Sequence, residues 1–223
     1  YWTQVVDIEI PDPIEFEVSP GGENSIAAAA ALISGAKNPV ILNGAGVVLS
    51  EGGIQASMDL AERLDAPVCV GYQHNDAFPG SHPLFAGPLG YNGSKAGMEL
   101  IKSADVVVCL GTRLNPFSTL PGYGMDYWPT DAKIIQVDIN PDRIGLTKKV
   151  TVGIVGDAAK VARGILAGLS ETAGDAGRAD RKSRIATAKS TWAQQLSSMD
   201  HEDDDPGTTW NERARADKPD WMS

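Results

Sequence analysis

The chain has 223 residues, 42% of them hydrophobic, with a formal net charge of −10, two cysteines and three histidines. A chain of this length can bury a core without disulfides or metals, and its apolar runs are too short to span a membrane. The negative charge argues against nucleic-acid binding, which needs clustered Lys and Arg to neutralise phosphates. We therefore expect a soluble cytoplasmic protein with one core, in which Cys69 and Cys109 are small buried hydrophobes.

The N-terminal segment, residues 1–22, mixes acidic and apolar residues and contains Pro11 and Pro13. A central strand does not tolerate prolines, so we expect these residues to form an extended arm between domains. The sequence does not begin with Met, and we expect it to be a piece of a longer chain.

Residues 23–170 alternate apolar runs with helical patterns. Runs of Val, Ile and Leu are typical of strands buried on both faces of a parallel sheet. The pattern therefore predicts an α/β fold, a doubly wound, Rossmann-like parallel sheet of five to six strands flanked by helices. The expected strands are 39–43, 67–70, 106–110, 133–137 and 151–155, and the expected helices are 23–34, one capped by Ser50, 95–102 and 158–169.

Two long irregular segments, residues 71–93 and 111–131, leave the carboxyl ends of expected strands, where functional loops are usually found. Residues 171–178 are small and polar and are typical of a linker. We expect residues 171–223 to form this linker, a further helix and a tail that leads to a third domain. The helix, over 182–199, has a narrow apolar stripe of Ile185, Ala188, Trp192 and Leu196, and the acidic run 202–205 is expected to be a solvated loop.

Several residues at the ends of the expected strands form a candidate nucleotide-binding edge. Open parallel sheets bind ligands at the carboxyl ends of their strands. Arg113 can meet a phosphate and Asp138 can accept hydrogen bonds from a ribose. Each has a simpler alternative, an ion pair for Arg113 and a turn cap for Asp138, while Gly44, Gly46 and Gly111 can serve only in tight turns.

Other kinds of site find less support in the sequence. Leu49 stands where a dinucleotide fingerprint has its third glycine, which argues against ordinary NAD binding. We interpret Asp157 as the N-cap of helix 158–169 and expect no metal site in these residues. His82 is a candidate for an active-site loop because histidine titrates near neutrality, but it can equally hold the loop by hydrogen bonds.

Short motifs follow one another in a recognisable order between residues 23 and 169. They include Ala66-Pro67-Val68, Ala104-Asp105-Val106 and the segments 36–47, 78–79 with 82–83, 87–90, 110–114 and 136–141. Together they resemble the central domain of thiamine-diphosphate enzymes of the acetolactate synthase type. Any one motif alone is weak, whereas the whole series is specific.

The resemblance implies that thiamine diphosphate and Mg²⁺ are held by N- and C-terminal domains of the same polypeptide, which lie outside these residues. This chain alone would then have no catalytic residue and no activity, and the full-length enzyme would be a homo-oligomer. Residues 1–10 and 81–91 resemble those of family members that convert sulfoacetaldehyde and phosphate to acetyl phosphate and sulfite.

Two alternatives stay open. The chain could be the central domain of another acetolactate synthase-like enzyme, or a module that binds ADP or FAD around Gly44, Arg113 and Asp138, as some relatives do. Acetyl transfer has no redox step, so a flavin is not expected and would serve structure if it were bound.

Overall fold

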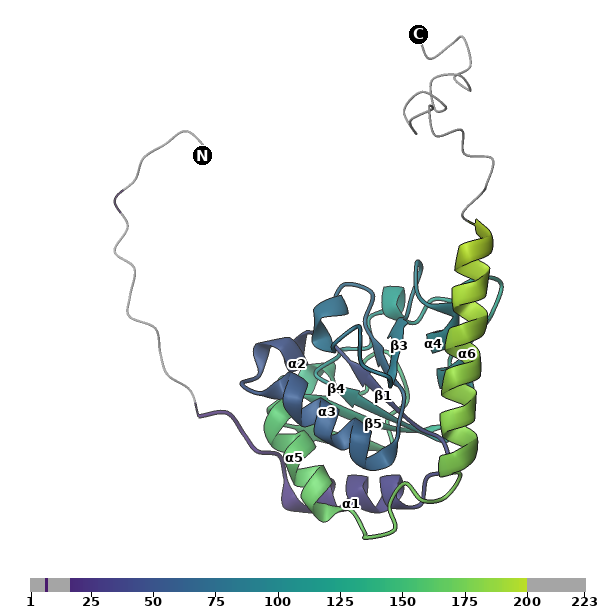
Figure 1. Cartoon of the computed structure of the whole chain (residues 1–223). Helices are drawn as coiled ribbons and strands as arrows, with labels where there is room; N and C mark the ends of the chain where they lie inside the picture. Colours follow the sequence, from purple (N-terminus) through teal and green to yellow (C-terminus); the bar gives the residue numbers. More distant parts are fainter. Residues whose placement is uncertain (1–6, 8–16, 200–223) are drawn as a thin grey trace.

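The computed structural model describes Asp7 and residues 17–199, which form a six-stranded, all-parallel sheet with helices around it (Figure 1). The strand order, β3-β2-β1-β4-β5-β6, is that of the doubly wound dinucleotide-binding fold, so the predicted fold class is confirmed. The strands are β1 (Pro39–Asn43), β2 (Val68–Val70), β3 (Phe85–Pro88), β4 (Val106–Leu110), β5 (Lys133–Asp138) and β6 (Val152–Val155).

The helices pack in two groups. One group contains α1, α2, α3 and α5, in which α5 contacts each of the other three, and the other contains α4 and α6 (Figure 1). None of the described helices combines the length and hydrophobicity that crossing a bilayer requires. The helices are α1 (Glu23–Ser34), α2 (Ala45–Leu49), α3 (Gly53–Leu64), α4 (Lys95–Lys102), α5 (Ala158–Gly168) and α6 (Arg178–Met199), with short 3₁₀ turns η1 (Asn75–Ala77), η2 (Pro116–Ser118) and η3 (Pro141–Arg143).

The central strands are the middle of the hydrophobic core. Every residue of β1 and β4 is buried, as their continuous apolar sequence predicts. Cys69 and Cys109 are fully buried free thiols. Burial raises the pKa of Cys69 to about 12 and raises that of Cys109 as well, so both remain protonated packing residues.

Two predictions about local structure are wrong. Ser50 is not the N-cap of the next helix but ends α2, and α3 begins at Gly53 after Gly52, whose φ of 70° is left-handed. The segment 71–93 is not wholly irregular, because it contains β3. Among the described strands this edge strand pairs only with β2, and its Gly and Pro conceal the strand pattern in the sequence.

The segment after residue 170 packs on the sheet-bearing core. Helix α6 begins at Arg178, earlier than expected, and lies against α4. Of its predicted apolar stripe, Ile185 and Ala188 are buried and Trp192 is half-buried, whereas Leu196 is 45% exposed. The expected arm (except Asp7 and residues 17–22) and the acidic run 202–205 lie outside the described residues, and the division into three segments stays a prediction.

Candidate functional site

A cleft of about 420 Å³ opens at the carboxyl edge of the sheet, where β1 and β4 lie side by side. From this pair the strand order runs outward in both directions, to β2 and β3 on one side and to β5 and β6 on the other. Open α/β sheets bind ligands at such a switch point. Because β1, β4 and β5 are neighbours, the topology brings all the residues of the predicted edge to this one cleft. They are Gly44, Gly46, Gly111, Arg113 and Asp138.

The three glycines allow two backbone segments to touch at the floor of the cleft. A Cβ atom on Gly46 would lie 2.6 Å from the Cα of Gly111, and one on Gly44 would lie 2.7 Å from the Gly111 carbonyl oxygen. Gly111 also has a φ of 58°, which disfavours other residues. The Gly46 N–H donates to the Gly111 carbonyl at 2.9 Å, so this amide joins the two segments and is not free for a ligand.

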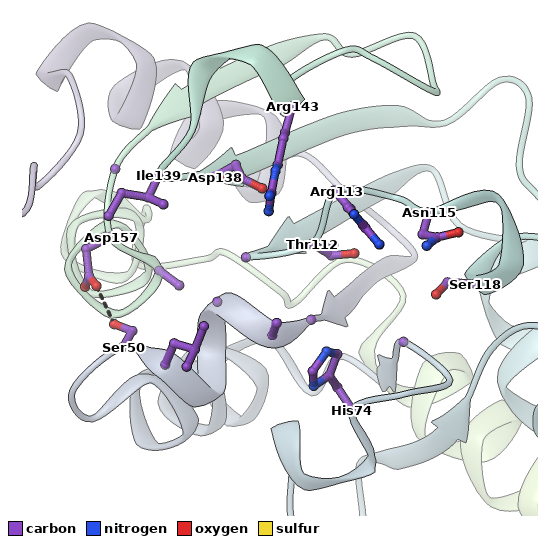
Figure 2. Close-up of a pocket in the computed structure, with 18 of the residues that line it drawn as sticks. Ser50, His74, Thr112, Arg113, Asn115, Ser118, Asp138, Ile139, Arg143 and Asp157 are labelled. Atoms are coloured by element: carbon purple, nitrogen blue, oxygen red, sulfur yellow. Dashed lines mark hydrogen bonds between the residues drawn. The ribbon is translucent and has the colours of Figure 1, made fainter. Parts of the chain in front are cut away.

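Three charged side chains around the cleft have polar atoms that form no hydrogen bond with a described residue. Asp138 is only 6% exposed; its Oδ1 accepts from the Asn140 N–H at 2.9 Å, and its second oxygen has no hydrogen-bond partner in the described part of the chain. The guanidinium groups of Arg113 and Arg143 make no ion pair or hydrogen bond with any described residue. Figure 2 shows the three side chains around the same hollow. Such a set suits an anion that also carries hydroxyl groups.

Sequence reasoning missed several polar residues of this cleft. His74 follows β2, and Figure 2 shows its ring at the cleft, which Thr112 and Ser118 of η2 also line. Arg143 belongs to η3, which follows β5. Each of these residues comes after the carboxyl end of a strand, and that position in the sequence was the signal that could have marked them as candidates.

His82 lies away from the cleft, at the amino end of β3. Its Nδ1 accepts from the Leu84 N–H at 3.2 Å, and its Nε2 is 3.1 Å from the Glu62 carboxylate. The ring also packs edge-on against Phe78. These contacts are consistent with a residue that holds its loop, and the part of His82 in an active-site loop stays a prediction.

Asp157 is the N-cap of α5, as predicted. Its Oδ1 accepts from the Lys160 N–H at 2.9 Å and its Oδ2 accepts from the Ser50 hydroxyl at 2.7 Å. The same hydroxyl accepts from the Ala159 N–H at 3.0 Å, so Ser50 joins the end of α2 to the start of α5. Among the described residues, no three His, Cys, Asp or Glu side chains lie close enough to hold a metal ion.

Residues 26–165, a stretch that includes every strand of the sheet, match the family model described as thiamine pyrophosphate enzyme, central domain. The chain belongs to this family. It is 74% identical over 223 residues to a sulfoacetaldehyde acetyltransferase of Roseovarius nubinhibens, and 68% identical over 222 residues to one of Rhodobacter capsulatus. These alignments cover all of this chain but only 37% and 38% of the relatives.

A solved structure gives an independent comparison of the central-domain fold. Benzoylformate decarboxylase from Polynucleobacter necessarius superposes on 76% of this chain, and on 32% of its own, with a TM-score of 0.57 and 22% identity. At this identity the likeness shows the fold alone. The family resemblance drawn from the motifs is thus confirmed by the sequence match, and the Rossmann-like architecture is confirmed by the sheet itself.

Proposed function

We propose that this chain is the central domain of a thiamine-diphosphate-dependent sulfoacetaldehyde acetyltransferase. The observation that carries the proposal is the 74% identity over the whole chain to a protein of that name. The full-length enzyme would convert sulfoacetaldehyde and phosphate to acetyl phosphate and sulfite. Since the chain spans about 37% of that relative, this activity belongs to a longer polypeptide, which we expect to be a cytoplasmic homo-oligomer.

The described residues do not fit thiamine diphosphate with its metal ion. A diphosphate-bound Mg²⁺ needs several oxygen ligands in an octahedral arrangement. The described part of the chain offers no such cluster, and both carboxylate oxygens of Asp157 are already bonded. We therefore assign the cofactor to the other domains and give this domain the role of a scaffold.

The scaffold would present the segments 71–93 and 111–131 to those domains. Tyr127 fixes the two segments to each other, because its hydroxyl accepts from the Gly90 N–H at 3.1 Å and donates to the Ser118 carbonyl at 3.2 Å. The ring is fully buried. Because one hydroxyl bonds to both segments, they are held in a fixed position relative to each other. A domain that shapes a neighbouring active site would need such fixed loops.

Activity measurements on the full-length protein and on this chain test the proposal. The full-length protein should form acetyl phosphate and sulfite from sulfoacetaldehyde and phosphate, and this chain alone should form none. Turnover of pyruvate without turnover of sulfoacetaldehyde would instead favour another acetolactate synthase-like enzyme. Acetyl phosphate formation by this chain alone would contradict the scaffold role.

A second candidate function, adenine-nucleotide binding, is favoured by the charges around the cleft. The cleft volume of about 420 Å³ falls within the range of small-molecule sites. Arg113 and Arg143 would meet phosphates and the free oxygen of Asp138 would accept from ribose hydroxyls. In a protein with a net charge of −10, two guanidinium groups that pair with no described residue and line one hollow are consistent with an anionic ligand.

Calorimetric titration with ADP, FAD and coenzyme A tests this second candidate. Micromolar affinity for one of them would support it, and Asp138→Asn and Arg113→Ala should then each weaken binding about tenfold, or about 1.4 kcal/mol. Asp142→Asn is the matched control, since Asp142 is exposed on the same turn and does not line the cleft. Heats equal to those of dilution for all three ligands would reject nucleotide binding.

A further inference from the structure

A second hollow lies away from the cleft, between α3, α6 and the segment before β3. It has a volume of about 630 Å³, and we call it the α6 groove. Pro83, Leu84 and Ile185 give it an apolar wall, in which Leu84 and Ile185 are buried. Lys182 and Lys189 of α6 also line it, about two helical turns apart. The α6 groove therefore places two primary amines beside an apolar surface.

The two lysines lie in different electrostatic surroundings. The Nζ of Lys182 is 3.3 Å from the Asp65 carboxylate, and the Lys182 side chain is 59% exposed. The half-buried Lys189 forms no ion pair in the described part of the chain. Its Nζ instead donates to the backbone carbonyls of Pro83 at 3.0 Å and, more weakly, of His82 at 3.5 Å. Of the two lysines, only Lys182 therefore has a carboxylate that favours its charged form.

The other charged groups that line the α6 groove are already paired with each other. Glu62 of α3 is 3.1 Å from the Nε2 of His82. Asp65, which follows α3, pairs with Lys182. Burial is thus the main influence on Lys189, and it lowers the pKa of this amine from the ordinary value of 10.5. A lower pKa leaves more of the amine neutral at pH 7.5, where an ordinary lysine is only about 0.1% neutral.

The hydrogen bonds of Lys189 leave its nitrogen able to react. A neutral amine has two N–H groups and one lone pair on its nitrogen. Both N–H groups can stay bonded to the carbonyls of Pro83 and His82, which keeps the nitrogen in place. The lone pair takes no part in either bond, and the neutral amine of a lysine is a nucleophile towards carbonyl carbon.

We propose that Lys189 is acetylated by acetyl phosphate, the activated acetyl compound that the full-length enzyme would form. The Nζ lone pair attacks the acetyl carbon, the bond from this carbon to the phosphate oxygen breaks, and phosphate leaves with the electron pair. One proton passes from the nitrogen through solvent to the phosphate, so the products are N-acetyl-lysine and inorganic phosphate. The inference rests on the proposed function for the source of the acetyl donor, and on the α6 groove for the choice of this lysine.

Acetylation would change the contact between α6 and the segment before β3. The amide that forms is neutral and keeps a single N–H, so one of the two carbonyls that Lys189 bonds loses its donor. The volume of the α6 groove and its apolar wall can accommodate the added methyl group. The modification would therefore weaken the attachment of α6 to residues 82–84 without displacing the core.

Acetyl phosphate added directly to the full-length protein tests the proposal. After incubation at a pH of about 7.5, peptide mass spectrometry measures the acetylation rate at each lysine. Lys189 should react about threefold or more faster than Lys182, the matched control on the same helix and groove. Exposure alone predicts the reverse order, because Lys182 is the more exposed. Lys160, which is exposed and donates to the Val18 carbonyl at 3.0 Å, is a second control and should also react more slowly.

The dependence on pH and a substitution separate this chemistry from a chance difference in rate. As the pH rises towards 10.5, the control lysines also become neutral, so the advantage of Lys189 should shrink. Lys189→Arg keeps the charge and the donors but has no reactive amine, because an arginine stays protonated. This variant should lose the acetyl group that forms first and should leave the rates at Lys182 and Lys160 unchanged.

Three outcomes would overturn the proposal. They are no acetylation at Lys189, equal rates at Lys189 and the two control lysines near neutral pH, and an advantage of Lys189 that stays constant as the pH rises. Because acetyl phosphate is supplied from outside, these results do not depend on turnover. A full-length protein that forms no acetyl phosphate from sulfoacetaldehyde would contradict the proposed function and would leave the measured rates at Lys189 unaltered.

Discussion

Replacing Arg181 with methionine should lower the free energy of unfolding by about 3–5 kcal/mol, because this side chain ties α6 to the rest of the domain. Arg181 is 2% exposed, and no carboxylate forms an ion pair with it in the described part of the chain. Burial, with the nearby Arg178, lowers its pKa from the ordinary value, but an arginine stays charged at neutral pH. Its guanidinium group donates instead to the backbone carbonyls of Lys37, Leu64, Asp65, Gly174 and Ala176.

The magnitude follows from the carbonyls that methionine would leave without a donor. The bonds to Leu64 at 2.7 Å and to Gly174 at 2.5 Å are buried, and a buried polar group without its partner costs about 1–3 kcal/mol. The other three carbonyls lie nearer the surface and can reach water. Removing a desolvated charge recovers part of the loss, which keeps the net effect within about 3–5 kcal/mol.

Urea and thermal unfolding followed by circular dichroism measure the effect. For a domain of this size the expected change corresponds to a fall in Tm of about 10 °C. Arg181→Lys should lose less, because an ammonium group keeps the charge and has three donors. Arg163→Met is the matched control: Arg163 is exposed, makes one long bond of 3.3 Å to the Glu51 carbonyl, and should change stability by no more than about 0.5 kcal/mol. A loss below about 1 kcal/mol for Arg181→Met would refute the reasoning that this side chain anchors α6.

Two further substitutions test the glycine contact and the hydroxyl that joins the loops. Gly46→Ala should cost about 1–3 kcal/mol, measured by urea unfolding, because the new Cβ would lie 2.6 Å from the Cα of Gly111 and neither backbone can move freely. Tyr127→Phe should cost about 1–3 kcal/mol at neutral pH, because Gly90 and Ser118 each lose a partner. Burial raises the pKa of Tyr127 to about 12 from 10.0, so its protonated form contributes stability that is lost as pH rises from about 10 towards 12. Denaturant titrations across this range should show a smaller alkaline loss in Tyr127→Phe than in the unmodified protein.

Two other substitutions of the same residue types are the controls. Gly35→Ala adds a Cβ with no atom nearer than 3.9 Å and should be nearly neutral, so an equal loss at positions 35 and 46 would argue against the contact with Gly111. Tyr91→Phe removes an exposed hydroxyl and should leave both stability and its alkaline fall unchanged. An identical pH dependence in Tyr127→Phe and the unmodified protein would show that Tyr127 does not cause the alkaline loss.

The sequence predicted most of the sheet because its strongest signals are local. The central strands are continuous runs of Val, Ile and Leu, and β1 and β4 have the predicted bounds. The edge strand β3 was not predicted, since Phe85-Ala86-Gly87-Pro88 has no alternation, and pairing with β2 alone makes it a strand. Ser50 was misplaced for a related reason: its hydroxyl bonds to Asp157 and Ala159, which are far away in the chain.

The sequence by itself determined the parallel α/β fold, the family, and the residue types at the carboxyl edge, because periodicity and short motifs are properties of neighbouring residues. Only the tertiary structure decided that Gly46 and Gly111 touch, that Arg143 and His74 join Arg113 and Asp138 at one cleft, and that His82 lies at the other edge. Strand order sets these placements, and it depends on crossover direction and on packing between residues far apart in the chain. The link between the segments 71–93 and 111–131 is likewise a tertiary feature, because the hydroxyl groups of Tyr127 and Tyr123 join two loops that are separate in the sequence.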